Sequence, residues 1–404
     1  MNYLQTYNYF KSVENYTDSR IDIDDNTVMM NYDFESQHRF ILPGGLGNSD
    51  DYEYSPDFNQ EYEPDVIRQI LNKKDAEIVE NIKFRYHILS PKNAGRAKGI
   101  ILMFHGFNEK HWTKYYPWTK YIVEKTGKSV VLFPIAFHMN RAPSMWSDAH
   151  KMFDISARRK ARHKDLLCSS LSNVAISTRL HNKPQRFIWS GLQTYYDIID
   201  FIHAVKAGTH PAIDSRASVD IFAYSIGSFL AEILMMTNEN DYFANSRLVS
   251  FCGGAVFNRL SPVSKFILDS EANVSLYSYL VEHLESHLKR DEALRYYLSD
   301  SHPEGVNFRS MLDYKVLIDQ REAIFRRIHS RIYAIGLTND TVVPAYEIIN
   351  TLQGRRRDIP VRVDVFDLPY PYRHEDPFPA LKNIQDDVDS QFRKIFDRIT
   401  DFLK

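Results

Sequence analysis

The sequence predicts an α/β fold with a central, mostly parallel sheet that is flanked by helices. Two continuous apolar runs, 99–104 and 129–134, have the length of strands that are buried on both faces. Between them, residues 116–126 show helical spacing and stop before Gly127, a residue type that often closes a helix. A strand, a helix and a second strand at this spacing form a βαβ unit, so we expect neighbouring strands to be parallel.

The composition is that of a globular chain with a large apolar core. Of its 404 residues, 44% are hydrophobic and 25% are charged, which is ordinary for a folded protein and excludes disorder throughout. The chain is long for one compact core. We therefore expect a main domain over residues 76–404, preceded by an N-terminal extension over residues 1–75.

The charge balance gives no reason to expect a nucleic-acid partner. Lys and Arg number 50 against 52 Asp and Glu, a formal net charge of -2, so no global field attracts a polyanion. Basic runs at 158–164 and 355–357 are interpreted as solvated helix faces or loops, with binding of an anionic substrate group as the alternative.

Cysteine usage and hydropathy favour a cytoplasmic protein without a membrane segment. Cys168 and Cys252 cannot build a disulfide framework, and Cys252 lies in an apolar run typical of a buried free thiol. The first residues lack the basic start and apolar stretch of a secretory signal. Nowhere does the sequence reach about 18 uninterrupted apolar residues, the length that a membrane helix needs.

The remaining elements follow in order along the chain. Residues 1–64 show little periodicity, a short helix is expected over 66–71, and 82–89 alternates like a half-buried strand. The alternation of helices and strands then continues with these segments: helix 195–205, strand 218–223, helix 228–236, strand 247–256, strands 331–336 and 361–368, and closing helix 388–403.

Two stretches interrupt the alternation. Residues 145–188 are polar, basic and poorly periodic, so we interpret them as an insertion near the mouth of the sheet. Residues 260–330 have helical periodicity, strong charge and almost no strand character, which predicts a helical cap.

A serine lies on the turn where strand 218–223 runs into the next helix. Such a sharp turn strains the serine backbone and crowds the positions two before and two after it, which Ala223 and Gly227 fit. Ser225 would then project above the sheet at a helix N-terminus, which favours a nearby oxyanion. An isolated small-x-Ser-x-Gly pattern is common by chance, but the strand and helix around it favour a nucleophile.

A second turn, His105-Gly106-Phe107, ends an earlier strand. An acyl-transfer transition state needs two donors for its developing negative charge. We expect them to be the backbone N–H groups of Ile226 and Phe107, with Gly106 letting the chain turn. The alternative is an ordinary turn, and His105 itself is expected to be a packed residue rather than a base.

An aspartate and a histidine follow two late strands. Asp340 comes just after strand 331–336, where it could instead cap the next helix. His374 lies in a Pro-rich loop after the last strand. Because the carboxyl ends of parallel strands meet at one crevice, Ser225, Asp340 and His374 are expected to come together.

The chain resembles the α/β-hydrolase superfamily over roughly residues 82–404. The resemblance rests on His105-Gly106, on Ala223-Tyr224-Ser225-Ile226-Gly227, and on Asp340 and His374 after strands. It implies the chain order serine, acid, histidine, with a helical cap in the place that residues 260–330 occupy. Ala223 replaces the usual first glycine, as in some lipases and esterases of the superfamily.

The resemblance implies a serine hydrolase in which His374 is the base, Asp340 orients it and Ser225 attacks a carbonyl carbon. The expected substrate is a small-molecule carboxylic ester, and no cofactor is expected. No metal is expected either, because no histidine pair has helical spacing with an acidic partner. The alternatives are a non-catalytic binding protein and a thioesterase, peptidase, lyase or perhydrolase with the same three residues.

Overall fold

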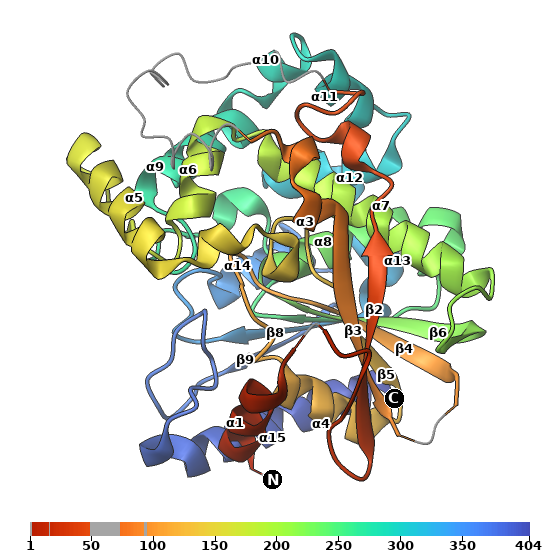
Figure 1. Cartoon of the computed structure of the whole chain (residues 1–404). Helices are drawn as coiled ribbons and strands as arrows, with labels where there is room; N and C mark the ends of the chain where they lie inside the picture. The colour runs from red at the N-terminus through yellow and green to blue at the C-terminus, as the bar shows by residue number, and fades with distance from the viewer. Residues whose placement is uncertain (1, 16, 49–72, 93–94) are drawn as a thin grey trace.

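In the computed structural model of this protein, which describes residues 2–15, 17–48, 73–92 and 95–404, nine strands form one sheet. Their order across the sheet is β1-β2-β3-β5-β4-β6-β7-β8-β9 (Figure 1). The strands are β1 (Arg20–Asp22), β2 (Thr27–Glu35), β3 (Lys83–Pro91), β4 (Ala97–Phe104), β5 (Ser129–Leu132), β6 (Ile213–Tyr224), β7 (Leu248–Phe251), β8 (Ile332–Leu337) and β9 (Arg362–Phe366).

The direction of pairing changes along the sheet. The pairs β1–β2, β2–β3 and β3–β5 are antiparallel. The pairs β5–β4, β4–β6, β6–β7, β7–β8 and β8–β9 are parallel. The sheet is therefore mostly parallel, as the sequence predicts. Its parallel strands all point their carboxyl ends at the same edge, which is where a site is expected.

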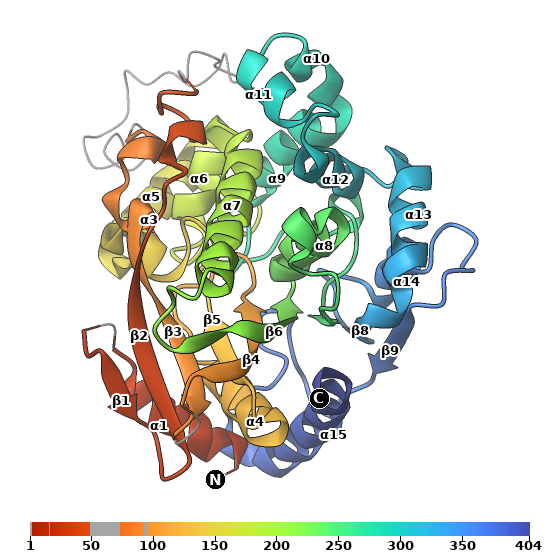
Figure 2. The ribbon, with the colours of Figure 1, turned by 90° about the vertical axis from the view of Figure 1, so that its right-hand side faces the viewer.

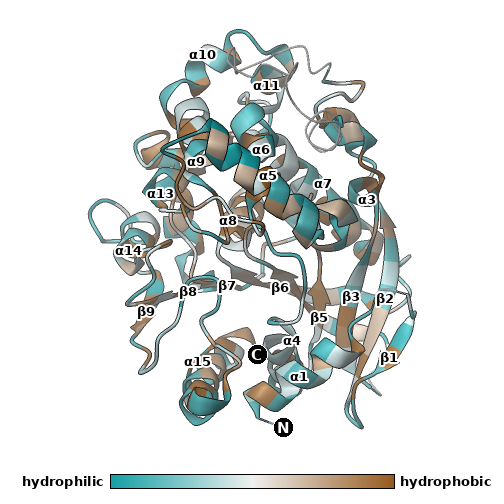
Figure 3. Ribbon diagram, turned by 60° about the vertical axis from the view of Figure 1, so that its left-hand side comes forward, coloured by the Kyte–Doolittle hydropathy of each residue, from teal (hydrophilic) through white to brown (hydrophobic). Residues whose placement is uncertain are grey.

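Helices cover both faces of the sheet (Figure 2). One face carries α1 (Tyr3–Val13), α4 (Tyr116–Thr126) and α15 (Gln385–Leu403), and both chain ends lie on that side. The other face carries α7 (Arg186–Lys206), α8 (Ile226–Thr237), α13 (Ile318–Ile328) and α14 (Ala345–Leu352). Each face has its own buried hydrophobic cluster, and the strands between them are the most hydrophobic part of the ribbon (Figure 3).

The closing helix α15 illustrates how sequence spacing produces this packing. Its buried residues recur every three or four positions: Val388, Phe392, Ile395, Phe396, Ile399 and Leu403. The rings of Phe392 and Phe396 lie 4.4 Å apart, and each buried side chain of this size contributes about 1.5–3 kcal/mol. Helix α4 ends at Thr126 as expected, because Gly127 has a φ of 70°.

The stretch 260–330 is built from helices, as predicted. It contains α9 (Ser270–Tyr277), α10 (Leu284–Leu288), α11 (Glu292–Tyr297), α12 (Pro303–Leu312) and α13. The insertion 145–188 forms α5 (Ala149–Arg162) and α6 (Val174–Asn182), and α6 packs against α9. Both groups lie on the side of the sheet that carries α7 and α8 (Figure 1).

Several expected boundaries were wrong. Helix α7 begins at Arg186, not at 195, because its first turns are also buried against the core. Strand β7 stops at Phe251 rather than at 256, since the chain turns at Cys252 with a φ of 49°. Short helical turns that the sequence did not predict are α3 (Val79–Ile82), Arg39–Ile41, Asp75–Glu77, Met139–Arg141, Ser144–Ser147, Glu239–Asp241, Phe257–Arg259 and Lys382–Ile384.

The N-terminal region differs most from expectation. No regular element was expected over residues 1–64, yet α1, β1 and β2 lie there, and β2 pairs with β3 along its whole length. Residues 20–35 are thus part of the sheet, while a domain boundary at residue 75 stays a prediction. The helix expected over 66–71 lies outside the described residues. Among the described residues, no helix has the length and hydropathy needed to cross a membrane.

Candidate active site

Ser225 lies on a strained turn between β6 and α8. Its φ of 55° and ψ of -121° are rarely adopted by residues other than glycine, and such strain costs about 1–3 kcal/mol. Gly227 is required there, because a Cβ atom on it would lie 2.8 Å from both the His105 carbonyl oxygen and the Phe104 Cβ. Ala223 is fully buried on the other side of the turn. The crowding predicted around this serine is thus present.

The structure brings Ser225, His374 and Asp340 into one hydrogen-bonded chain. The Ser225 Oγ lies 2.7 Å from His374 Nε2, and His374 Nδ1 lies 2.7 Å from Asp340 Oδ2. An ionised carboxylate can only accept, so Nδ1 carries the proton and Nε2 presents its lone pair to the serine hydroxyl. The histidine and aspartate side chains are 3% and 0% exposed, which shields the contact between them from water.

Asp340 does not cap the following helix, which was its alternative interpretation. Helix α14 has Pro344 as its N-cap residue and no side-chain capping hydrogen bond. Instead, the Asp340 Oδ1 accepts the backbone N–H groups of Val342 and Val343, both at 2.9 Å, in the loop before the helix. Since Oδ1 is occupied in this way, Oδ2 is fixed toward His374.

Phe107 and Ile226, whose N–H groups are the expected oxyanion donors, both lie beside the pocket that Ser225 borders. Neither N–H has an acceptor within the described part of the chain. Two free donors beside a nucleophile can hold the negative charge that develops on an attacked carbonyl oxygen. Gly106 does not contribute its N–H, which is donated to the Tyr115 hydroxyl at 2.8 Å.

His105 is a packed residue, as expected, and not a base. Its Nδ1 donates to the Gly106 carbonyl at 2.7 Å and its Nε2 accepts the Ile135 N–H at 2.9 Å, so both ring nitrogens are occupied. Burial holds its pKa well below the usual value, which keeps the imidazole neutral. It thereby fixes the turn that carries Phe107.

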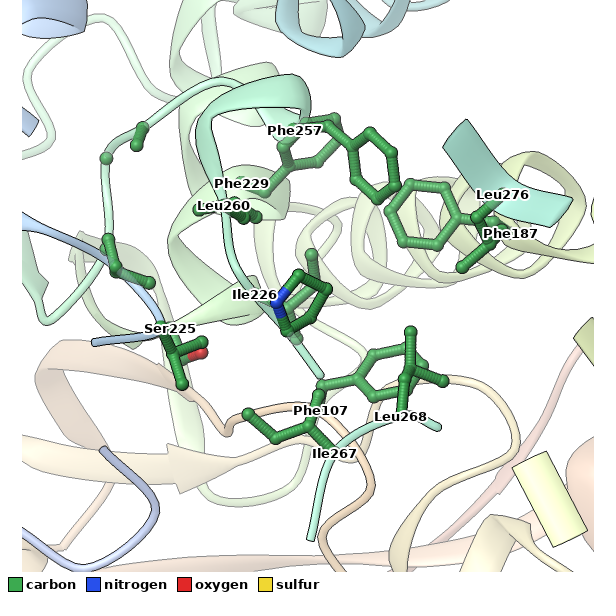
Figure 4. Close-up of a pocket in the computed structure, with 16 residues that line it drawn as sticks. Phe107, Phe187, Ser225, Ile226, Phe229, Phe257, Leu260, Ile267, Leu268 and Leu276 are labelled. Carbon is green, nitrogen blue, oxygen red and sulfur yellow. The ribbon is translucent and has the colours of Figure 1, made fainter. Parts of the chain in front are cut away.

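An apolar pocket of about 560 Å³ opens beside Ser225 (Figure 4). Its side chains come from five regions, namely the 105–107 turn, helices α7 and α8, the 253–268 segment, helix α9 and the 342–343 loop. Ser225 contributes its polar atom at one side, and Phe187 and Leu276 lie at the side farthest from it (Figure 4). The larger lining side chains are Phe107, Phe187, Ile226, Phe229, Phe257, Leu260, Ile267, Leu268, Leu276, Val342 and Val343.

A second pocket of about 380 Å³ adjoins the first and shares Phe107 and Phe187 with it. Phe137 and Trp146 form an aromatic wall there, with rings 6.5 Å apart. The described residues contain no group of three or more His, Cys, Asp or Glu side chains that could hold a metal ion.

Comparisons with known proteins give one family and a set of solved structures. A model described as "Family of unknown function (DUF6051)" matches residues 1–404, and no curated protein matches the chain. Carboxyl esterase 2 from Tuber melanosporum is similar with a TM-score of 0.43 and 10% identity over 79% of this chain and 81% of its own.

Two further solved structures are similar to the same degree. An esterase from Pyrobaculum calidifontis has a TM-score of 0.41 and 9% identity over 79% of this chain and 81% of its own. An acylaminoacyl peptidase from Pyrococcus horikoshii has a TM-score of 0.40 and 12% identity over 80% of this chain and 40% of its own.

Proposed function

The chain belongs to the family of unknown function DUF6051, and we propose that this member is a serine hydrolase that cleaves carboxylic esters of apolar acids. One observation carries the proposal: the hydrogen-bonded chain from Ser225 through His374 to Asp340 stands at the side of an apolar pocket. A protein that only bound a ligand would have no need for a strained serine whose hydroxyl lies within hydrogen-bond distance of a histidine.

The proposed reaction uses each group at its observed position. His374 Nε2 takes the hydroxyl proton as Ser225 Oγ attacks the ester carbonyl carbon, and the N–H groups of Ile226 and Phe107 bind the resulting oxyanion. Asp340 keeps the proton on Nδ1 and stabilises the imidazolium. When the intermediate collapses, the imidazolium gives its proton to the departing alkoxide, leaving an acyl-enzyme.

Water completes the cycle. His374 Nε2 removes a proton from a water molecule, which attacks the acyl carbonyl carbon, and the same N–H groups hold the second oxyanion. The Ser225–acyl bond then breaks, the serine oxygen recovers the proton from His374, and the free acid leaves. No cofactor takes part in this sequence.

The pocket lining supports an uncharged, apolar acyl group. No charged side chain belongs to the lining among the described residues, and a carboxylate or ammonium placed there would lose its hydration without a partner. An aliphatic or aromatic acyl chain gains about 25 cal/mol for each Å² of apolar surface that it buries. We therefore expect the protein to prefer esters with an apolar acid portion over esters whose acid portion is charged.

Labelling with a fluorophosphonate tests the nucleophile. We expect wild type to gain the mass of the probe and Ser225→Ala to gain none. Ser228→Ala is the matched control, because Ser228 lies in the same helix and its hydroxyl is buried against the Ala223 carbonyl at 3.3 Å. Equal labelling of Ser225→Ala would remove this serine from its role, and no labelling of wild type would favour a binding protein.

A series of p-nitrophenyl esters tests the bond and the acid. We expect hydrolysis of the butyrate and octanoate esters with a higher kcat/KM than the acetate, and poor hydrolysis of a hemisuccinate, whose acid carries a charge. If the serine is labelled but none of these esters is cleaved, the ester assignment is wrong while the nucleophile stands.

A further inference from the structure

Lys114 contacts the loop that carries His374. Its Nζ donates to the carbonyl oxygen of Glu375, the next residue after the histidine, at 2.7 Å. The same ammonium group lies 4.7 Å from the centre of the Tyr224 ring. That ring stacks on the His374 imidazole, with the two planes 16° apart and the centres at 5.6 Å, and its hydroxyl donates to the His374 carbonyl oxygen.

The same lysine also contacts the turn that carries Phe107. Its Nζ forms an ion pair with Glu109, and the two side chains are 13% and 19% exposed. Glu109 accepts the Tyr115 hydroxyl at 3.1 Å, and that hydroxyl accepts the Gly106 N–H at 2.8 Å. A continuous set of polar contacts thus leads from one ammonium group to the backbone next to the candidate oxyanion donor.

Tyr224 fills the space between the two loops. A Cβ atom on Gly106 would lie 3.1 Å and 3.2 Å from two carbons of the Tyr224 ring, so a side chain at this position would press against the ring. The ring therefore touches the oxyanion turn on one side and the His374 imidazole on the other, while Lys114 lies over it.

We propose that Lys114 and Tyr224 are positioning residues that fix His374 relative to the oxyanion turn. The inference rests on the proposed function, because it concerns the same base and the same donors. Lys114 uses its N–H donors on two loops that lie far apart in sequence, and Tyr224 fixes the histidine backbone and its ring. Neither residue touches the reacting atoms.

The expected effect follows from how strongly the rate depends on alignment. A displacement of about 1 Å between a base and its proton donor lowers turnover by about 10²-fold. Lys114→Met keeps the length and apolar stem of the side chain but removes every contact of its ammonium group. We expect kcat for the butyrate ester to fall by about 10²-fold with KM changed little, because the acyl pocket does not include Lys114.

Lys120→Met is the matched control. Lys120 is equally buried at 10% exposure, pairs with Asp24 and Glu124, and lies in the neighbouring helix α4 without contacting either loop. We expect it to lower the thermal midpoint without lowering kcat. Lys114→Arg, which keeps the charge and the donors, should restore most of the activity lost in Lys114→Met.

Tyr224→Phe provides a second test that does not depend on the folding of Lys114→Met. It keeps the ring stacked on His374 and removes only the hydroxyl contact, so we expect kcat to fall about tenfold. Unchanged kcat in Tyr224→Phe and in folded Lys114→Met would overturn the inference. An equal loss of kcat in Lys114→Met and in Lys120→Met would also overturn the inference. Labelling of the wild-type serine by the fluorophosphonate separates these outcomes from failure of the proposed function.

Discussion

Replacing Asp340 by Asn tests whether the histidine tautomer matters. The backbone N–H groups of Val342 and Val343 both point at Oδ1, so the amide oxygen of an asparagine must take that position to avoid facing two donors. The amide NH₂ then faces His374 Nδ1. An NH₂ group can only donate, which forces the ring proton onto Nε2 and leaves no lone pair for the Ser225 hydroxyl.

The size of the effect follows from the number of functions lost. His374 loses the lone pair on Nε2 that accepts the serine proton. The imidazolium formed during the reaction also loses the negative charge of Asp340 that stabilises it. For this arrangement a loss of about 10⁴-fold in kcat is typical, which corresponds to about 5 kcal/mol in the activation free energy. The fold should persist, because the contacts of Oδ1 with the 342–343 loop are retained.

The assay is kcat for the butyrate ester, together with the thermal midpoint by circular dichroism. Asp220→Asn is the control: Asp220 is 6% exposed, accepts the Arg247 N–H at 2.8 Å and pairs with Lys128 at 2.7 Å. We expect it to affect stability and not kcat. If Asp340→Asn turned over within about threefold of wild type, the tautomer argument would be refuted and the orienting acid would lie elsewhere.

Two further predictions concern the core and the pocket. Burial raises the pKa of Glu232 to about 8 from 4.5, so across that window the unfolded state is ionised while the folded state keeps its proton. The free energy of unfolding should therefore fall by about 1 kcal/mol per pH unit as pH rises, and urea denaturation of Glu232→Gln should show a flatter dependence; equal slopes would contradict this. Phe187→Ala opens the first pocket toward the second, because Phe187 lines both. The preferred p-nitrophenyl ester should then have a longer acyl chain, and an unchanged preference would place the end of the acyl site elsewhere.

The sheet and the convergence of Ser225, Asp340 and His374 were predictable because their signals are local. Strand β4 and the last residues of β6, from Ile221 to Ala223, are apolar runs that need no partner to be recognised, and a serine between a strand and a helix marks its own turn. Asp340 and His374 were found because each follows a strand, and parallel strands bring their carboxyl ends to one edge. This general rule is why residues far apart in sequence were expected to lie at one site.

The missed features depend on contacts between distant segments. Strand β2 does not alternate cleanly, since three consecutive residues from Thr27 to Met29 are buried, so its pattern does not distinguish it from a loop. The contacts of Lys114 with Glu375 and of Tyr224 with His374 span 261 and 150 residues. A lysine before a helix and a tyrosine before a serine carry no local sign of these partners.

The base and the acyl pocket are also connected to each other. Glu375, which follows His374, accepts the Ser264 hydroxyl at 2.6 Å, and Arg373, which precedes it, lies 4.6 Å from the centre of the Phe266 ring. The next residues along that segment, Ile267 and Leu268, line the pocket beside Ser225. A change in this pocket wall therefore also acts on both neighbours of the histidine. We expect substitutions in the 264–268 segment to change acyl preference and kcat together. Substitutions of Phe187, on the far side of the pocket, should change acyl preference without this effect on kcat.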